Sequence, residues 1–304
     1  MDNQALVSII IPTCNRAQML SRAIDSALRQ TYQNIEIIIV DDCSRDNTYE
    51  IVHNYLNKDK RIVYFRNEEN RGAAYSRNVG IERSQGSFLA FLDDDCEYLP
   101  EKIEEEINLM HSLALTPSII YSNMWIEKEN TTTPLSLNIK NKLLAPKDIF
   151  CCRYSFLEPT SWLCKENIIK RMNGFDINAY CYDDMDLLTR IILSGEKIYF
   201  LNKPLSIRHK VNGISDISLK QIKAKEYFLE KHFLKIKKYK KYFSRFYYRL
   251  GKDLFKLGDF KMAKEYFWKA FLLSPFKIEY FFKSIYPNFK NSRRKSLFAK
   301  LEDD

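Results

Sequence analysis

The sequence contains no apolar run of the roughly 18 residues that a membrane-spanning helix needs. Its longest early candidate, Leu6 to Ile11, has the length of a strand. The first residues, Met1-Asp2-Asn3-Gln4, include no basic segment, so we expect no signal peptide and a reducing, cytoplasmic location. The seven cysteines include no C-x-x-C pair and only four histidines accompany them, which favours reduced thiols over a structural zinc site.

Two phosphate-binding signatures are also missing. The first buried strand is followed by Pro12-Thr13-Cys14-Asn15-Arg16 and not by G-x-G-x-x-G, which disfavours a dinucleotide site. No G-x-x-x-x-G-K-[ST] loop occurs either. Any phosphate group would therefore have to be held by a metal ion and by side chains.

What is present is an ordinary globular composition with an uneven charge. The 304 residues are 45% hydrophobic and 29% charged, enough for a real core and about two domain-sized units. Residues 221–304 contain 22 Lys and Arg against 9 Asp and Glu, a net charge of +13, whereas residues 1–220 have a net charge of −4. This asymmetry predicts a catalytic or small-ligand module beside a surface for membranes or polyanions. A solvated helical surface without a partner is the alternative interpretation.

Residues 1–92 alternate between strand and helix periodicity. Leu6–Ile11, Ile35–Val40, Arg61–Arg66 and Ser87–Leu92 are typical of strands, and Met19–Arg29 and Ala73–Ser84 of helices between them. Such alternation predicts an α/β fold, with a mostly parallel sheet covered by helices on both faces. Beyond it, the polar stretch Glu127–Asn141 is predicted to be a loop.

Acidic and polar residues follow three of these strands. They are Thr13 to Arg16, Asp41-Asp42, and Asp93-Asp94-Asp95. Ligands of parallel α/β sheets bind at the carboxyl ends of strands, so one cleft is expected there. Three adjacent carboxylates repel one another unless a cation such as Mg²⁺ or Mn²⁺ neutralises them, which favours a metal site over a solvated acidic turn. Asp42 could bind a uracil or ribose group, or could cap the next helix.

From about residue 218 the pattern is helical and rich in aromatic residues, and Lys231 to Lys241 is its most basic stretch. A small-residue pattern there resembles one tetratricopeptide helix pair, at about residues 247–275; its residues are Gly251, Leu254, Gly258, Ala263, Phe267, Ala270 and Pro275. Because such repeats need about three copies to be stable alone, a docking or capping pair is predicted.

Taken together, several motifs resemble the family 2 glycosyltransferases. They are Val7 to Arg16, Val40 to Thr48, Asn70-Arg71-Gly72 with Arg77 to Gly80, Leu92 to Asp95 with Pro100, Gly174-Phe175-Asp176, and Asp183 to Leu187. The resemblance extends to roughly residue 210. It implies a GT-A fold, a nucleotide-diphosphate sugar donor, a divalent metal (Mn²⁺ or Mg²⁺) and inversion at the anomeric carbon.

The resemblance also implies roles for individual residues. Pro12, Thr13, Asn15 and Arg16 would line the base and ribose pocket, and Asp42 would contact the base. Arg77 would orient the donor. In the Asp-x-Asp motif, Asp93 or Asp94 would lie near the ribose and Asp95 on the metal. Asp184, beside Asp183, would be the general base, and His209 a further metal ligand. The chain departs from the family pattern at Cys96, where many members have Asp, at Asp183, where Glu is usual, and in the short segment after Arg208.

The sequence thus predicts a catalytic domain over residues 1–215 and a basic helical region over 220–304. The predicted activity is metal-dependent transfer of a hexose or N-acetylhexosamine from a UDP-sugar to a glycan or lipid-linked acceptor in surface polysaccharide synthesis. The basic region would hold the enzyme at an anionic membrane, with no specific nucleic acid expected. The alternatives are an inactive GT-A-like binding protein whose tail recruits partners, a nucleic-acid binder and a nucleotidyltransferase.

Overall fold

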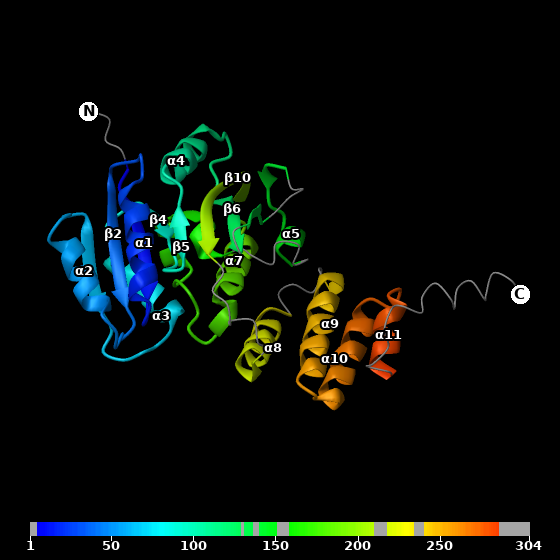
Figure 1. The fold of residues 1–304 in the computed structure, drawn as a ribbon. Helices are drawn as coiled ribbons and strands as arrows, with labels where there is room; N and C mark the ends of the chain where they lie inside the picture. The colour runs from blue at the N-terminus through cyan, green and yellow to red at the C-terminus, as the bar shows by residue number, and fades with distance from the viewer. Residues whose placement is uncertain are drawn as a thin grey trace, which may run out of the picture. The chain divides into compact units, whose positions relative to one another are not determined.

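A computed structural model of the chain describes residues 5–128, 131–135, 140–150, 158–209, 218–233 and 240–285. The chain divides into two compact units, Met1–Asp216 and Ile217–Asp304. Figure 1 shows the strands and the first helices in one unit and helices alone in the other. Each unit is described by itself.

One sheet forms the framework of the first unit, in the strand order β3-β2-β1-β4-β9-β6-β10-β5, with β7 paired to β6 and β8 to β10. Strands β3, β2, β1 and β4 are parallel, as are β6 and β10, whereas β9 and β5 run antiparallel to their neighbours. The strands are β1 (Val7–Thr13), β2 (Ile35–Asp41), β3 (Ile62–Arg66), β4 (Phe88–Phe91), β5 (Cys96–Tyr98), β6 (Ile119–Lys128), β7 (Thr131–Pro134), β8 (Lys142–Leu143), β9 (Trp162–Lys165) and β10 (Ile198–His209).

Helices cover both faces of this sheet, which confirms the predicted α/β class. Strand β1 is buried at every position, because alternate side chains face opposite helix layers. Ile9 belongs to a core shared with the first, second and fourth helices. Ile10 points the other way, against Gly80 of the third helix, where any Cβ would lie 2.4 Å from its side chain. The helices are α1 (Ala17–Leu28), α2 (Thr48–Leu56), α3 (Ala73–Arg83), α4 (Lys102–Ser112), α5 (Pro146–Phe150), α6 (Glu166–Arg171) and α7 (Asp183–Leu193), with short 3-10 turns η1 (Pro159–Ser161) and η2 (Tyr180–Tyr182).

The prediction of a loop over Glu127–Asn141 is wrong in part. Strand β6 continues to Lys128, and Thr131–Pro134 pairs with it as the antiparallel strand β7. The reason is an open edge: β9 pairs only with Ile119–Tyr121, so the rest of that side of β6 accepts another strand. Three successive threonines, which are β-branched, suit that extended conformation.

The second unit is helical, as predicted. Its helices are α8 (Leu219–Phe233), α9 (Lys240–Lys256), α10 (Phe260–Leu273) and α11 (Ile278–Ile285). Helices α9 and α10 pack closely at Gly251, where a Cβ would lie 2.9 Å from the Phe267 ring. Asp259 caps α10 by accepting a hydrogen bond from the backbone N–H of Met262 at 2.9 Å. Most of the basic stretch between Lys231 and Lys241 lies outside the described residues. Among the helices described, none is both long and apolar enough to cross a membrane.

Candidate active site

The carboxyl ends of β1, β2 and β4 meet at one edge of the sheet and surround a cavity of about 310 Å³. This first cavity collects most of the residues predicted for donor binding. It is lined by Pro12, Thr13, Cys14, Arg16, Asp42, Asn70, Gly72, Ala73, Ser76, Arg77, Asp93, Asp94 and Asp95.

The three adjacent aspartates have different surroundings. Asp94 is buried and accepts hydrogen bonds from the Thr13 hydroxyl at 2.9 Å and the Arg16 guanidinium at 2.8 Å. Burial raises the pKa of Asp94 to about 6, although both hydrogen bonds act in the opposite direction. Asp93 accepts a 2.6 Å bond from Arg77. Asp95 lies 3.8 Å from Arg16 and accepts a long 3.4 Å bond from the Cys96 thiol, so it is the least neutralised of the three.

Asp42 lines the first cavity and also holds its rim. Its carboxylate accepts backbone N–H bonds from Arg71 and from Gly72, the latter at 2.7 Å, and a side-chain bond from Asn67 at 2.8 Å. Gly72 has a φ of +89°, a conformation that costs a residue with a Cβ. Asp42 therefore fixes the turn that begins α3, and not the start of α2 as the capping alternative predicted.

Asn15 is the predicted donor residue that does not line this cavity. Its backbone is left-handed, with a φ of +54°, which Asn tolerates better than most residues. Its side-chain oxygen accepts the backbone N–H of Arg45 at 2.7 Å, and its own N–H donates to the Ser44 hydroxyl at 2.9 Å. Asn15 thus ties the loop after β1 to the loop after β2.

A second cavity of about 160 Å³ shares Arg77, Asp93 and Asp95 with the first. Arg77 is buried between them and donates to Asp93 at 2.6 Å and to Asp183 at 3.1 Å. These two ion pairs bring the start of α7 to the Asp-x-Asp segment, 90 residues earlier in the chain. The second cavity is lined by Arg77, Asp93, Asp95, Glu158, Pro159, Cys181, Asp183, Asp184 and Arg208.

Asp183 and Asp184 begin α7 and face this second cavity. Asp183 is the partner of Arg77, whereas Asp184 accepts only the backbone N–H of Met185 among the hydrogen bonds of the described residues. Desolvation, and next the charge of Asp183, raise the pKa of Asp184 well above its usual range. A carboxyl group with a raised pKa, open to a cavity, has the properties of a general base.

Sequence reasoning assigned no site role to Glu158, yet Glu158 lies in the second cavity and is paired with Arg208 of β10. Burial raises the pKa of Glu158 to about 7, although Arg208 opposes the shift. The one sequence signal is an acidic residue directly before Pro159 and the short buried strand β9. Thr160 of the same turn accepts the backbone N–H of Asp93 at 3.1 Å, which fixes the turn against the Asp-x-Asp segment.

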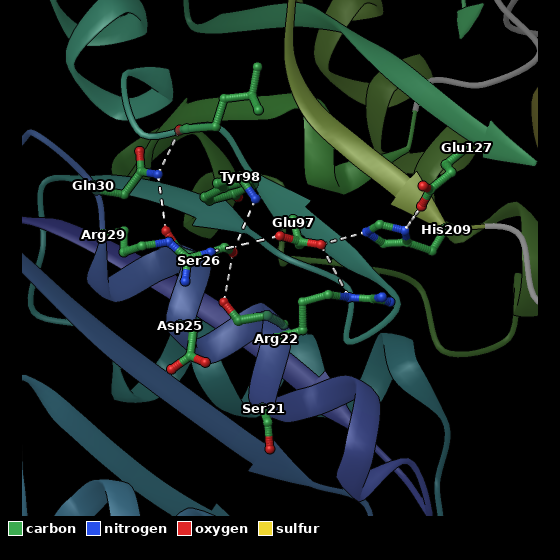
Figure 2. A network of polar contacts seen from close by, with 12 residues as sticks. Ser21, Arg22, Asp25, Ser26, Arg29, Gln30, Glu97, Tyr98, Glu127 and His209 are labelled. Atoms are coloured by element: carbon green, nitrogen blue, oxygen red, sulfur yellow. Dashed lines mark hydrogen bonds and ion pairs between the residues drawn. The ribbon is translucent and has the colours of Figure 1, made fainter. Parts of the chain in front are cut away.

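His209, predicted as a metal ligand, ends β10, and its ring lies between two carboxylates. Figure 2 shows the ring between Glu97 and Glu127; Arg22 approaches the same Glu97 oxygen as the ring, and Arg29 lies on the far side of Glu97. The Nε2–Glu97 distance is 2.6 Å, and Nδ1 contacts Glu127. The His209 backbone N–H donates to the Asp95 carbonyl at 3.2 Å, so the residue adjoins the Asp-x-Asp segment through its main chain.

The acidic residues of the two cavities have the chemistry that a divalent metal ion needs. Five carboxyl groups and two guanidinium groups line the second cavity, so acidic groups outnumber basic ones there. Asp93 and Asp95 face both cavities, and their hard oxygen atoms suit Mg²⁺ or Mn²⁺. Among the described residues, no three metal-binding side chains are already grouped as a closed site. Asp93 and Asp95 could therefore supply part of the ligand shell of such an ion.

Comparison with known proteins gives concordant matches. The family model for glycosyl transferase family 2 matches residues 8–162, about half of the chain. The colanic acid biosynthesis glycosyl transferase WcaA of Escherichia coli, described as putative, is 32% identical over 235 residues, covering 75% of this chain and 81% of WcaA. WfaP of Escherichia coli, a UDP-Glc:alpha-D-GlcNAc-diphosphoundecaprenol beta-1,3-glucosyltransferase, is 41% identical over 128 residues. That match covers 42% of this chain and 49% of WfaP, and several other curated relatives are likewise matched over about half of their length.

Two solved structures show the same fold at low identity. TarS of S. aureus in complex with UDP-GlcNAc superposes with a TM-score of 0.68 at 18% identity, covering 87% of this chain and 81% of that chain. The mannosyltransferase PcManGT of Pyrobaculum calidifontis, in complex with GDP-Man and Mn²⁺, gives a TM-score of 0.60 at 14% identity, with 95% and 89% covered.

Proposed function

Because the chain belongs to glycosyltransferase family 2 and is a glycosyltransferase, we propose that it transfers a hexose or N-acetylhexosamine from a UDP-sugar, with inversion at the anomeric carbon. The observation that carries this proposal is the pair of adjoining cavities that share Arg77, Asp93 and Asp95. One cavity has the polar lining that a nucleotide needs, and the other contains a carboxyl group with a raised pKa. The UDP-Glc in the name of WfaP and the UDP-GlcNAc bound to TarS favour the uridine donor.

The nucleotide would occupy the first cavity. Pro12, Thr13 and Arg16 would line the base and ribose, and Asp42 would accept a hydrogen bond from the base while it holds the Gly72 turn. Asn15 would act indirectly, by fixing the loop that carries Thr13 and Arg16.

The diphosphate would lie where the two cavities meet. Asp95 would hold a divalent ion there, Mn²⁺ or Mg²⁺, which when bound neutralises the charge that develops on the departing diphosphate. Asp93 and Asp94 would lie near the ribose and are held by Arg77 and Arg16 respectively. His209 would first have to release Glu97 or Glu127 before a ring nitrogen could bind metal.

Asp184 would be the general base. An acceptor hydroxyl in the second cavity would give its proton to the Asp184 carboxylate while its oxygen bonds to the anomeric carbon. The bond from that carbon to the diphosphate oxygen would break, and the nucleoside diphosphate would leave. Asp183 would hold the start of α7 in place through Arg77.

The acceptor would be a glycan or a lipid-linked sugar. Residues 220–304 would hold the catalytic domain, residues 1–215, at the anionic inner face of a membrane, and α9 with α10 would be a tetratricopeptide-like pair. The lipid-linked acceptor in the name of WfaP, and the net charge of +13 after residue 220, support this setting.

The test is thermal unfolding with UDP, GDP, dTDP and CDP, each with and without Mn²⁺, on the wild type and Asp95→Ala. We expect UDP to raise the unfolding temperature in a Mn²⁺-dependent way, and the Mn²⁺ dependence to disappear in Asp95→Ala. Asp59→Ala is the matched control, because Asp59 pairs with Arg61 outside both cavities. Stabilisation by no nucleotide would favour the inactive binding protein instead.

A further inference from the structure

Large apolar side chains are exposed at several positions of the second unit, and four of them lie close in sequence, on the second half of α10 and at the turn into α11. Trp268 and Leu272 lie one turn apart on α10, Phe276 lies in the turn that follows, and Ile278 begins α11. Their exposed fractions are 44%, 58%, 98% and 51%. We call these four residues the C-terminal apolar patch. Figure 1 shows α9, α10 and α11 side by side, with the turn that joins α10 to α11 at one end.

The internal packing of the unit does not need these side chains. The inner side of α10, which packs on α9, consists of Ala263, Tyr266, Phe267 and Ala270, all buried. Trp268 contacts the Phe271 and Phe281 rings with one edge, at centroid distances of 5.4 and 6.4 Å, and the rest of its ring remains exposed. Fully exposed phenylalanine is costly in water, and a set of such residues in one place marks a surface that meets another apolar phase.

The charge around the patch identifies that phase. Helix α10 carries Lys261, Lys264 and Lys269, all exposed, against the single acid Glu265. Lys277 and Glu279 flank Ile278, and they are bonded to Tyr280 and Tyr248 respectively, so the excess of positive charge near the patch comes from α10. Tryptophan and phenylalanine beside lysines are the side chains that favour the boundary between lipid headgroups and acyl chains, where lysine reaches lipid phosphate. A protein partner would not require this excess of one charge, whereas an anionic bilayer does.

We propose that the C-terminal apolar patch inserts into the headgroup layer of an anionic phospholipid bilayer, with the α10 lysines on the lipid phosphates. The proposal rests on the proposed function only in that a lipid-linked acceptor gives the membrane a purpose. The helices lie on the bilayer and do not cross it, in agreement with the lengths of those described. Phe276 is the deepest residue, because it is the most exposed apolar side chain among the described residues of its unit.

The test is flotation of the full chain with vesicles of phosphatidylcholine alone and with phosphatidylglycerol added, at low and high salt. We expect binding to the anionic vesicles, weakened by salt. Phe276→Ser should weaken it about tenfold or more, from the apolar surface that returns to water. Each exchange of Lys261, Lys264 or Lys269 for Gln should weaken it about fivefold. Leu219→Ser is the matched control: Leu219 is 68% exposed in the same unit but outside the patch, and its variant should bind as the wild type does.

Fluorescence gives a second, position-specific measurement. Of the three tryptophans in the chain, Trp162 is fully buried, whereas Trp268 belongs to the patch. Lipids brominated on the acyl chain should quench tryptophan emission in the wild type, and this quenching should disappear in Trp268→Phe. The unfolding temperature of Phe276→Ser should equal that of the wild type, because Phe276 is almost fully exposed, and Trp268→Phe should lower it only slightly, because an aromatic ring still packs against Phe271 and Phe281.

The proposal is overturned if Phe276→Ser binds anionic vesicles as strongly as the wild type does, or if the quenching survives in Trp268→Phe. A wild-type dimer in sedimentation velocity that Phe276→Ser dissociates, without vesicle binding by either protein, would also overturn it and assign the patch to a second copy of the chain. Nucleotide stabilisation of the same preparations separates the two proposals. Stabilisation by UDP without vesicle binding refutes the patch and the membrane role of residues 220–304 but leaves the proposed transfer reaction standing, and vesicle binding without nucleotide stabilisation refutes the transfer reaction alone.

Discussion

Arg77→Met should destabilise the catalytic unit strongly, because Arg77 is the cation that joins the two halves of the site. Its side chain is 9% exposed and donates to Asp93 at 2.6 Å and to Asp183 at 3.1 Å. Removing one partner of a buried ion pair costs about 3–5 kcal/mol, since the remaining charge is left unpaired. Asp93 is 24% exposed and partly screened by water, so we expect the lower end, about 3 kcal/mol.

Urea unfolding of the full chain would measure this loss. Arg83→Met is the matched control, because Arg83 lies on the same helix, is exposed and, within the described part of the chain, packs on the Phe65 ring at 5.0 Å without an ion pair. That contact contributes about 0.5–1 kcal/mol at an exposed site. The difference between the two variants therefore isolates the buried ion pairs.

The loss of stability in Arg77→Met should depend on pH, and the pKa of Asp183 sets the direction of this dependence. Burial raises the pKa of Asp183, and Arg77 opposes that rise. Without Arg77 the pKa of Asp183 rises further, so the variant takes up a proton at a higher pH than the wild type does. Protonation removes the unpaired charge, and the stability difference between Arg77→Met and the wild type should shrink as the pH falls through that raised pKa. A loss no larger than that of Arg83→Met, or one that does not change with pH, would refute this reasoning.

Three further predictions concern other parts of the site. Asp184→Asn should lower the transfer rate about 10²- to 10⁴-fold and leave UDP binding unchanged. In the wild type, the transfer rate should fall on acidification at a pH above the ordinary aspartate range, and this fall should move to lower pH in Asp183→Asn, because the Asp183 charge raises the pKa of Asp184. Steady-state assays across pH measure both effects, and an unchanged rate or an unchanged pH profile would contradict the role of Asp184. Gly174→Ala should lower the free energy of unfolding in urea by about 1–3 kcal/mol, because Gly174 has a φ of +62° and its Cβ would lie 2.3 Å from Asn78. Gly195→Ala should lower it less, because Gly195 has a φ of +89° but faces open space. Equal losses of stability in the two variants would contradict the steric argument. His209→Ala should weaken the Mn²⁺ dependence of UDP binding less than Asp95→Ala does, because carboxylates already bind both nitrogens of the His209 ring. Titration calorimetry measures this dependence, and an equal loss in the two variants would mean that the ring moves to the metal.

The first half of the fold could be predicted from local pattern because its strands are short runs dominated by apolar residues, with Ser8 in β1 and Glu36 in β2 as exceptions. The pattern predicts a strand at Ile35–Val40, and β2 spans Ile35–Asp41. It predicts a helix at Ala73–Ser84, and α3 spans Ala73–Arg83. Strands β5 and β7 could not be predicted in this way. Cys96–Tyr98 is three residues long and is extended only because it pairs with Ser206–Arg208, more than a hundred residues later.

The residues of the site show the same contrast, because some are placed by local pattern and others by the strand order of the sheet. Residues directly after buried strands, such as Thr13, Asp42 and Asp94, reach the first cavity because parallel strands bring their ends together. Asn15 lies in the same loop but faces away, since a left-handed backbone turns its side chain toward Arg45. Glu158 reaches the second cavity through the order β4-β9-β6, which no local pattern encodes.

Asp94 and Asp95 show why residue type alone could not assign the roles within the motif. The two are adjacent and chemically identical, yet Asp94 is buried and held by Thr13 and Arg16, whereas Asp95 receives one long bond from a thiol. A carboxylate that is already satisfied by protein donors gains little from a metal, while one left facing an acidic cavity gains much, because the cation removes repulsion as well as adding a ligand bond. In the proposed site, the hydrogen bonds from Thr13 and Arg16 to Asp94 therefore favour Asp95 as the metal ligand, since Arg16 lies 3.8 Å from Asp95 but 2.8 Å from Asp94. Exchanging that arginine should make the two aspartates more alike in metal binding, even though neither aspartate has changed.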